Sequence, residues 1–354
     1  MLDDIIEDAL HDIKQAGLCI REGGLVAFPT ETVYGLGADA FNRHAVARVY
    51  STKGRPGDNP LILHVDGQEA FTELAQSPPD YAMELIKYHW PGPLTLVTKK
   101  KPNLPHWLGG HPDRETDTIG IRVPSHPIAM ALLKASGCVI AAPSANKAGR
   151  PSPTTAAHVL EDFPEAKDDS FMVLDGGGST VGLESTVIDI TGEYPVLLRP
   201  GAVTAERIRW VTGLKLEGAE SAKSPGQISP RSPGMKYKHY APRAPMTVVS
   251  GTPSNIASFV LRQCERPEYT NWPIGLLIRK ETRAFIPENI RGGVKILISG
   301  SDDMVIAKNL FSCLRQFDKL GVSLIYAEAV PEDGLGMAIM DRMLKAAEGR
   351  VINV

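Results

Sequence analysis

Short apolar runs bounded by glycine, proline and polar residues recur along residues 25–199, and such runs are typical of buried strands. Between several of them, apolar residues at helical spacing predict helices over residues 3–16, 126–136 and 154–163, and one more that begins at Asn42. The predicted strands are LVAF (25–28), LILHV (61–65), LTLV (94–97), TIGIRV (118–123), CVIAA (138–142), FMVLD (171–175), STVIDI (185–190) and VLLR (196–199). Because consecutive strands follow residue 171, we expect an α/β fold with a twisted mixed sheet and helices on its faces.

The pattern dissolves over residues 214–245, where Pro, Ser, Gly and Lys are frequent and apolar periodicity is lost. Such a composition is typical of a linker. Beyond it, the strand-like runs MTVVS, IGLLI, VKILIS and SLIYAEAV alternate with helical patterns. The sequence therefore predicts a larger domain at 1–213, an interdomain linker at 214–245 and a smaller Rossmann-like α/β domain at 246–354.

Length and charge agree with this division and limit the function. A chain of 354 residues is longer than one hydrophobic core usually grows, so two domains are expected. The net charge of -3 and the pI near 6.3 create no global field that would attract nucleic acid or an anionic membrane. Any phosphate-binding site must therefore be local.

Cysteine usage and the amino-terminal segment indicate a cytoplasmic protein. The four cysteines are scattered without a CxxC pair, so neither a disulfide framework nor a structural metal site is expected. The amino-terminal MLDDIIEDALHDI is acidic where a signal peptide would be basic, and no apolar run has the length that spans a bilayer.

The stretch FPTETVYGLG directly follows the predicted strand LVAF. Hydroxyl groups at the end of a strand, followed by a Gly-Leu-Gly turn, predict the wall of a pocket. GLGADA also fits the dinucleotide pattern G-x-G-x-x-A, but no second strand ending in an acid follows at the proper distance, which disfavours NAD binding. No Walker-type phosphate loop is present.

Two loops carry groups suited to anions. Lys53 and Arg55 follow a predicted helix in the Gly- and Pro-rich loop KGRPGDNP. Either cation alone would complement the helix dipole, but two cations in such a loop favour anion binding. Ser144 and Asn146 lie too far upstream of the next predicted helix to cap it, and their loop is suited to hold phosphate oxygens.

Arg122 lies inside the apolar run TIGIRV, where an unpaired guanidinium would be costly. Either a protein carboxylate or a ligand carboxylate must therefore pair with it, and the residue alone does not decide between them. Arg199 in LLRPG raises the same question. In LDGGGSTVGLESTV, a hairpin explains the glycines but not the hydroxyl of Ser185.

Taken in order, these motifs closely resemble those of the YrdC-type L-threonylcarbamoyl-adenylate synthases. They are FPTETVYGLGADA, KGRPGDNPLILHV, PGPLTLV, TIGIRVP, APSANKAGRPSPT, DGGGSTVGLESTV and LLRPG. The later SPGMKYKHYAP and the α/β pattern after it resemble the larger, two-domain subtype of that family. The resemblance implies that 1–213 is a YrdC-like catalytic domain.

This resemblance implies an enzyme, a nucleotidyltransferase. It would make L-threonylcarbamoyl-AMP and pyrophosphate from L-threonine, bicarbonate or CO2, and ATP, for the t6A modification of tRNA adenosine 37. The implied partners are these substrates and the tRNA threonylcarbamoyl transferase machinery, with tRNA itself as a further partner that the resemblance allows. Mg²⁺ is expected to be carried on the ATP phosphates, because no pair of carboxylates obviously holds it.

The resemblance also assigns site residues. The family's catalytic tetrad falls on Lys53, Arg55, Ser144 and Asn146. The threonine contacts fall on Thr32, His64, Arg122, Ala142 and Ser185, and the nucleotide contacts on Arg55, Asn59, Thr118, Ser144, Ser152, Arg199 and Tyr240. Arg122 is thereby expected to bind the threonine carboxylate.

Three alternatives stay open at this point. Lys236, Lys238 and Tyr240 of the linker either fold over the site as a lid or belong to a solvated tether. An RNA-binding module without turnover is a second possible function, which the acidic pI disfavours. A carbamoyl-transfer domain of the hydrogenase-maturation kind shares the fold, but those proteins carry further segments that this chain lacks.

Overall fold

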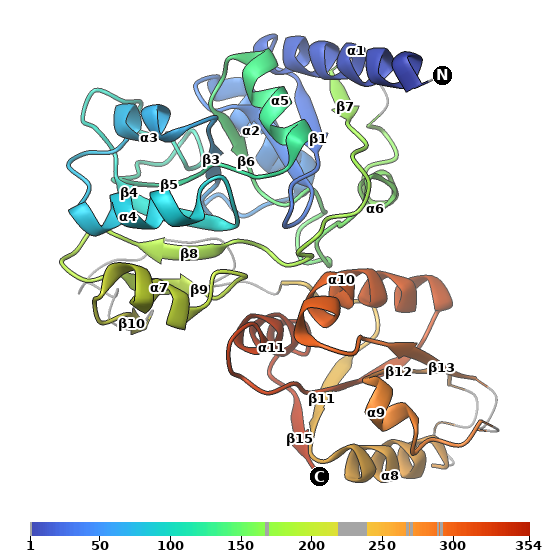
Figure 1. The fold of residues 1–354 in the computed structure, drawn as a ribbon. Coiled ribbons are helices and arrows are strands. Elements are labelled where there is room, and N and C mark those ends of the chain that lie inside the picture. Colours follow the sequence, from blue (N-terminus) through green and yellow to red (C-terminus); the bar gives the residue numbers. More distant parts are fainter. Residues whose placement is uncertain are drawn as a thin grey trace. The chain divides into compact units, whose positions relative to one another are not determined.

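The computed structural model describes residues 2–166, 170–218, 239–266, 269, 272–288, 290 and 293–354, with side chains from residue 10 onward (Figure 1). These residues belong to two compact units. The first unit comprises Met1–Ala148, Ser152–Thr180 and Glu184–Lys236, and the second comprises Gly149–Pro151, Val181–Leu183 and Tyr237–Val354.

The first unit is built on a mixed sheet with the strand order β10-β9-β8-β4-β5-β3-β6-β2-β1-β7. Its strands are β1 (Leu25–Phe28), β2 (Gly35–Asp39), β3 (Ile62–His64), β4 (Leu94–Lys99), β5 (Thr118–Arg122), β6 (Ile140–Ala142), β7 (Phe171–Val173), β8 (Thr186–Asp189), β9 (Val196–Arg199) and β10 (Glu217–Gly218). Strand β5 pairs parallel with β3 and antiparallel with β4, which confirms the predicted mixed sheet.

Helices cover both faces of this sheet. They are α1 (Leu2–Arg21), α2 (Arg43–Lys53), α3 (Gln68–Leu74), α4 (Asp80–His89), α5 (Pro127–Ser136), α6 (Ala156–Asp162) and α7 (Ala205–Thr212). Val26 and Phe28 of β1 pack in one apolar cluster with residues of α1 and α5, whereas Leu25 and Ala27 pack in another with residues of α2. Successive side chains of a strand point to opposite faces, so β1 contributes to two cores.

Helix α2 forms where its capping residues predict it. The Asn42 side chain accepts hydrogen bonds from the backbone N–H groups of His44 and Ala45. Gly54 ends the helix in the left-handed conformation, with φ 64°, which glycine adopts without steric cost. The residues predicted to face inward, Ala45, Val46, Val49 and Tyr50, are buried. The loop that carries Arg55 therefore starts at a fixed point.

The prediction of a turn at Gly35 and Gly37 is wrong, because these residues lie in β2, antiparallel to β1. A Cβ atom on Gly37 would lie 2.6 Å from Ile140 Cγ2 and 2.8 Å from Phe28 Cε1. The glycine is therefore required by side chains packed against the strand rather than by backbone conformation. Helices α3, α4 and α7 were also not predicted from the apolar pattern.

The second unit contains a parallel sheet with the strand order β13-β12-β14-β11-β15. Its strands are β11 (Met246–Ser250), β12 (Ile274–Ile278), β13 (Val294–Ile298), β14 (Leu324–Glu328) and β15 (Val351–Asn353), and its helices are α8 (Pro253–Cys264), α9 (Lys280–Arg283), α10 (Asp303–Leu320) and α11 (Gly336–Ala346). Four of these strands were predicted; β15 was not. The unit has the α/β architecture expected for the carboxyl-terminal part of the chain.

Two short segments that lie in the sequence between stretches of the first unit also belong to the second unit. Arg150 Nη2 forms an ion pair with Asp318 Oδ2 at 3.0 Å, and Arg315 Nη2 donates to the carbonyl oxygen of Pro151 at 2.6 Å. A Cβ atom on Gly182 would lie 2.4 Å from the Cα atom of Lys308, so only glycine fits there. Contacts in this unit thus join residues more than 120 positions apart in the sequence.

The described helices include none with the length and apolarity needed to cross a membrane. Over the same residues, no three side chains of His, Cys, Asp or Glu lie where they could share a metal ion. Three of the four cysteines are buried and Cys138 is half-buried.

Candidate active site

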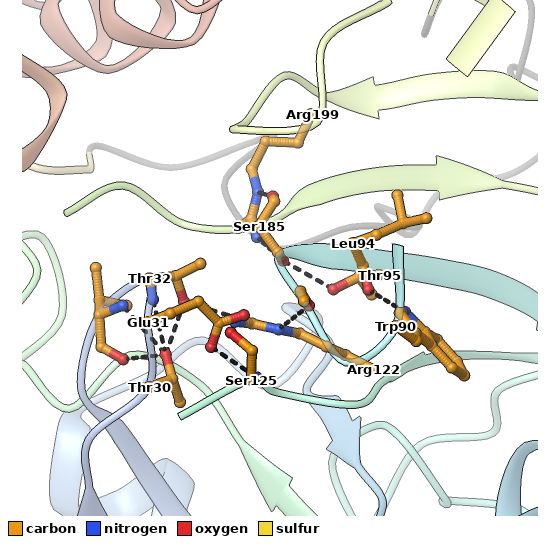
Figure 2. A network of polar contacts seen from close by, with 12 residues as sticks. Thr30, Glu31, Thr32, Trp90, Leu94, Thr95, Arg122, Ser125, Ser185 and Arg199 are labelled. Atoms are coloured by element: carbon orange, nitrogen blue, oxygen red, sulfur yellow. Dashed lines mark hydrogen bonds and ion pairs between the residues drawn. The ribbon is translucent and has the colours of Figure 1, made fainter. Parts of the chain in front are cut away.

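The hydroxyl-rich loop after β1 is organised by its own side chains (Figure 2). Thr30 Oγ1 accepts hydrogen bonds from the backbone N–H groups of Thr32 and Val33 at 3.2 Å and donates to the carbonyl oxygen of Val33 at 2.6 Å. Thr32 Oγ1 lies 2.7 Å from Thr30 Oγ1 and accepts from Arg122 Nη1 at 2.9 Å. These contacts bring the loop to the end of β5, as a wall next to Arg122.

Arg122 is almost fully buried and has three protein partners. Besides Thr32, they are the carbonyl oxygen of Gly92, 3.2 Å from Nε, and Glu31 Oε1, 2.6 Å from Nη2. The contact with Glu31 is close enough for an ion pair, although its angle is not that of a hydrogen bond. A protein carboxylate therefore pairs with the buried guanidinium, one of the two alternatives that the sequence left open.

Glu31 is a residue that we did not predict for the site. Its Oε2 accepts a hydrogen bond from the backbone N–H of Ser125 at 3.1 Å. Burial by itself raises the pKa of Glu31, but the charge of Arg122, together with the hydrogen bond from the Ser125 backbone, outweighs burial and holds that pKa below its usual value of 4.5. Glu31 is therefore ionised at neutral pH. The only sequence signal for it was its place between two predicted pocket threonines.

His64 lies beside Arg122 in the sheet, because the register pairs it with Arg122 on β5 and with Ile140 on β6. Its ring packs edge-on against the ring of Phe28, with 5.7 Å between the ring centroids, and Nδ1 is 3.2 Å from the carbonyl oxygen of Ile62. Burial, reinforced by the charge of Arg122, lowers the pKa of His64 to about 3. The ring is therefore neutral at pH 7 and does not add a second positive charge here.

Ser185 and Arg199 are brought together near the same end of the strands (Figure 2). Arg199 donates from Nε to the carbonyl oxygen and from Nη2 to Oγ of Ser185, both at 3.1 Å. The Oγ of Ser185 also lies 2.8 Å from Oγ1 of Thr95. Thr95 directly precedes Leu96, which pairs with Ile121, so the antiparallel register places Thr95 level with Arg122. Thr95 is fully buried and was not predicted.

Lys53, Ser144 and Asn146 form a second group. The Lys53 ammonium donates to the backbone carbonyl oxygens of Ser144 and Asn146, and the backbone N–H of Ala148 donates to the Lys53 carbonyl oxygen at 2.9 Å. Ser144 Oγ donates to Asn146 Oδ1 at 2.5 Å. The lysine thus ties the end of α2 to the loop after β6.

Arg55, the fourth tetrad residue, is held within its own loop. It donates from Nε to the carbonyl oxygen of Asn59 at 3.0 Å and from Nη2 to Asn59 Oδ1 at 2.8 Å. Nη2 also donates to the carbonyl oxygen of Pro60 at 2.7 Å. The hydroxyl of Tyr50 donates to the Asn59 carbonyl oxygen at 3.0 Å, which anchors the loop to α2.

The strand register shows how the two groups are separated. Ile62 pairs with Gly120 and Ala142, whereas His64 pairs with Arg122 and Ile140. The loop that begins after Ala142 therefore leaves the sheet at the end of β5 opposite to Arg122. Thr118 marks that end, four residues from Arg122, or roughly 13 Å along a strand. Of the predicted residues, Arg122, His64 and Ser185 thus lie toward one end of β5, and Thr118 and Ser144 lie toward the other. There are two exceptions: Arg199 lies beside Ser185, and Ala142 lies at the level of Gly120.

Two further residues that were predicted to contact the nucleotide, Ser152 and Tyr240, have partners outside these two groups. Ser152 Oγ donates to Oε1 of Glu184, and both residues are buried. Tyr240 belongs to the second unit, where its ring lies 5.2 Å from that of Phe311. Its role toward the nucleotide stays a prediction. Lys236 and Lys238, predicted for a lid, lie outside the described residues.

Comparison with known proteins decides the family. Residues 19–201 match the model Sua5_yciO_yrdC, described as "Telomere recombination", and residues 203–348 match the model described as "Threonylcarbamoyl-AMP synthase, C-terminal domain". The threonylcarbamoyl-AMP synthase of Pyrococcus abyssi is 43% identical over 97% of this chain and 96% of its own. The chain belongs to the two-domain Sua5-type threonylcarbamoyl-AMP synthases. The Bacillus subtilis threonylcarbamoyl-AMP synthase is 41% identical over 96% of this chain and 94% of its own.

A solved Sua5 structure agrees with this membership. The crystal structure of Pyrococcus abyssi Sua5 complexed with L-threonine has a TM-score of 0.85 and 42% identity, and the match covers 97% of this chain and 96% of that one. The comparisons confirm the resemblance found in the motifs, the α/β fold and an enzyme with threonylcarbamoyl-AMP synthase activity.

Proposed function

We propose that this synthase joins L-threonine, bicarbonate or CO2, and ATP into L-threonylcarbamoyl-AMP, with release of pyrophosphate, in the cytoplasm. The observation that carries the proposal is the separation of Arg122 from the group of Lys53, Ser144 and Asn146 along β5. Such a separation suits a product in which an amino acid and a nucleotide are joined through a carbamoyl group. The product would supply the t6A modification of tRNA adenosine 37, through the tRNA threonylcarbamoyl transferase machinery.

Arg122 would bind the threonine carboxylate at one end of the site. A guanidinium has five N–H donors, and three of its nitrogen–oxygen contacts are made to the protein, which leaves N–H groups for a ligand. Thr32 and Ser185 offer hydroxyl groups beside it, while neutral His64 and Ala142 would complete the threonine pocket.

Lys53, Arg55, Ser144 and Asn146 would surround the ATP phosphates at the other end. The remaining nucleotide contacts in this proposal are Asn59, Thr118, Ser152, Arg199 and Tyr240. Because the carbamate of threonine is already an anionic nucleophile, its oxygen attacks the α-phosphorus while the bond to pyrophosphate breaks. No protein nucleophile is needed, and the protein's work is to orient the reactants and stabilise the phosphate charge.

Mg²⁺ would be carried on the ATP phosphates, where it neutralises charge. The described residues contain no group of three or more His, Cys, Asp or Glu side chains that could hold a metal ion. In the same proposal, 1–213 is the catalytic domain, 214–245 is the interdomain linker and 246–354 is a separate α/β domain. Residues 219–238 of that linker lie outside the described part of the chain.

Pyrophosphate release by the purified full-length protein tests the proposal. L-threonine, bicarbonate and ATP are each supplied or omitted, and the Lys53→Ala variant is compared with Lys87→Ala, an exposed lysine on α4. We expect release only when all three substrates are present, little release from Lys53→Ala and normal release from Lys87→Ala. Release without threonine would instead indicate a carbamoyl-transfer enzyme, and none under any condition would contradict the proposed reaction.

A further inference from the structure

The buried cation of the threonine pocket already has a protein counter-ion. The side chains of Arg122 and Glu31 are only 4% and 8% exposed, and Nη2 and Oε1 are 2.6 Å apart. Each charge is thus compensated by the other before any ligand enters. A threonine carboxylate that binds Arg122 therefore meets a neutral ion pair instead of a free cation.

We propose that Glu31 competes with the substrate carboxylate for Arg122 and thereby weakens the affinity for threonine. The inference rests on the proposed function, in which Arg122 binds that carboxylate. With Glu31 present, binding places two carboxylates beside one guanidinium, and like charges at close range repel. Without the charge of Glu31, the threonine carboxylate would itself neutralise a buried cation, so its binding would gain more free energy.

The surroundings of Glu31 favour this role over that of a catalytic base. One carboxylate oxygen contacts Arg122 and the other accepts the N–H of Ser125, and Arg122 holds the pKa of Glu31 below its usual value, so the carboxylate is a weak base at neutral pH. The position of Arg122 also does not depend on Glu31 alone. The guanidinium also donates to the carbonyl oxygen of Gly92 and to Thr32 Oγ1, and neither contact involves Glu31.

Calorimetric titration of the full-length protein with two ligands tests the proposal. L-threonine carries the carboxylate, whereas L-threoninamide has the same side chain and amine but a neutral amide in its place. In Glu31→Gln, which keeps an acceptor for the Ser125 N–H, we expect L-threonine to bind at least about tenfold more tightly than in the unaltered protein. The affinity for L-threoninamide should change by less than about twofold. Glu22→Gln, at an exposed position, is the matched control and should change neither affinity.

Several outcomes would overturn the proposal. An unchanged or weaker affinity of Glu31→Gln for L-threonine would show that Glu31 does not compete with the substrate. An equal gain for both ligands would show a general effect on the pocket instead of a charge effect. If Glu31→Gln does not fold, Glu31→Asp is used instead, because it keeps the charge but shortens the side chain. We then expect a smaller gain in affinity, restricted to L-threonine. The absence of this gain would also contradict the proposal.

A double variant separates this inference from the proposed function. Glu31→Gln with Arg122→Leu removes both charges together, so no buried charge is left unpaired. If Arg122 binds the carboxylate, the double variant should lose measurable affinity for L-threonine. Retained affinity would contradict the assignment of Arg122 in the proposed function. Lost affinity in the double variant, without a gain in Glu31→Gln, would contradict only the competition by Glu31.

Discussion

The two ends of the site hold their cations in different ways. At the proposed threonine end, Arg122 is paired with the carboxylate of Glu31. At the proposed nucleotide end, the hydrogen bonds of Lys53 and Arg55 described above are all accepted by neutral oxygens of backbone or amide groups. A carbonyl dipole orients a cation and leaves its charge in place, whereas a carboxylate orients the cation and also neutralises its charge. The proposed ligands differ accordingly: threonine is a zwitterion, and the ATP triphosphate carries several negative charges.

Breaking the ion pair from one side gives the largest expected effect. In Arg122→Leu, Glu31 remains buried without its cation, and we expect the free energy of unfolding to fall by about 3–5 kcal/mol. Glu31→Gln combined with Arg122→Leu should recover most of this loss, because neither charge remains. Thermal and urea unfolding of the unaltered protein, of Arg122→Leu and of the double variant measure these free energies of unfolding. A double variant as unstable as the single one would show that packing, and not charge, supports this end.

Loss of Lys53 tests the nucleotide end. In Lys53→Ala the loop with Ser144 and Asn146 loses its side-chain tie to α2, and the proposed phosphate contact is lost as well. We expect the rate of pyrophosphate release to fall by about 10²–10³-fold, the usual cost of one preorganised donor. Circular dichroism should show an intact fold, and Lys87→Ala should keep the normal rate. If Lys53→Ala were as active as the unaltered protein, the contrast between the two ends would fail.

The protonation of His64 tests whether the threonine end accepts a second cation. Its pKa in the folded protein, about 3, lies below the ordinary value of 6.5, so the unfolded chain binds a proton first as the pH falls. The stability that His64 contributes is therefore complete above about pH 6.5 and decreases toward pH 3, by up to about 1.4 kcal/mol per pH unit. The expected loss between pH 6.5 and 5 is about 2 kcal/mol.

Urea unfolding between pH 6.5 and 5 measures this contribution, and this range avoids the titration of Glu31, whose pKa is below 4.5. His64→Gln should have a flatter pH dependence than the unaltered protein. Equal slopes would mean that His64 becomes protonated in the folded state and that two cations are tolerated beside each other.

Removal of one buried hydroxyl should give the smallest effect. Thr95→Val keeps the shape of the side chain but removes the contact with Ser185 Oγ, which Arg199 also contacts. We expect a loss of about 1 kcal/mol in stability, and a few-fold increase in the threonine concentration needed for half-maximal pyrophosphate release. Thr72→Val, on the exposed surface of α3, is the control. An unchanged threonine dependence would indicate that Ser185 does not need Thr95 for its position.

The sequence alone determined much of this protein. Apolar runs placed most strands of both units, and the capping side chain of Asn42 placed the start of α2, because these features depend on neighbours within a few residues. The ordered motifs also identified the family, and the position of Arg122 in an apolar run showed that a negative group must pair with it.

Only the tertiary structure decided which groups meet. That Glu31 pairs with Arg122, and that Lys53 reaches the carbonyl oxygens of Ser144 and Asn146, depends on contacts across roughly 90 positions of sequence. Gly37 lies in a strand instead of a turn for the same reason, since Phe28 and Ile140 fill the space that its side chain would need. Local preferences act over one turn or one strand, whereas partners so distant are brought together by the strand order of the mixed sheet, which no short stretch of sequence encodes.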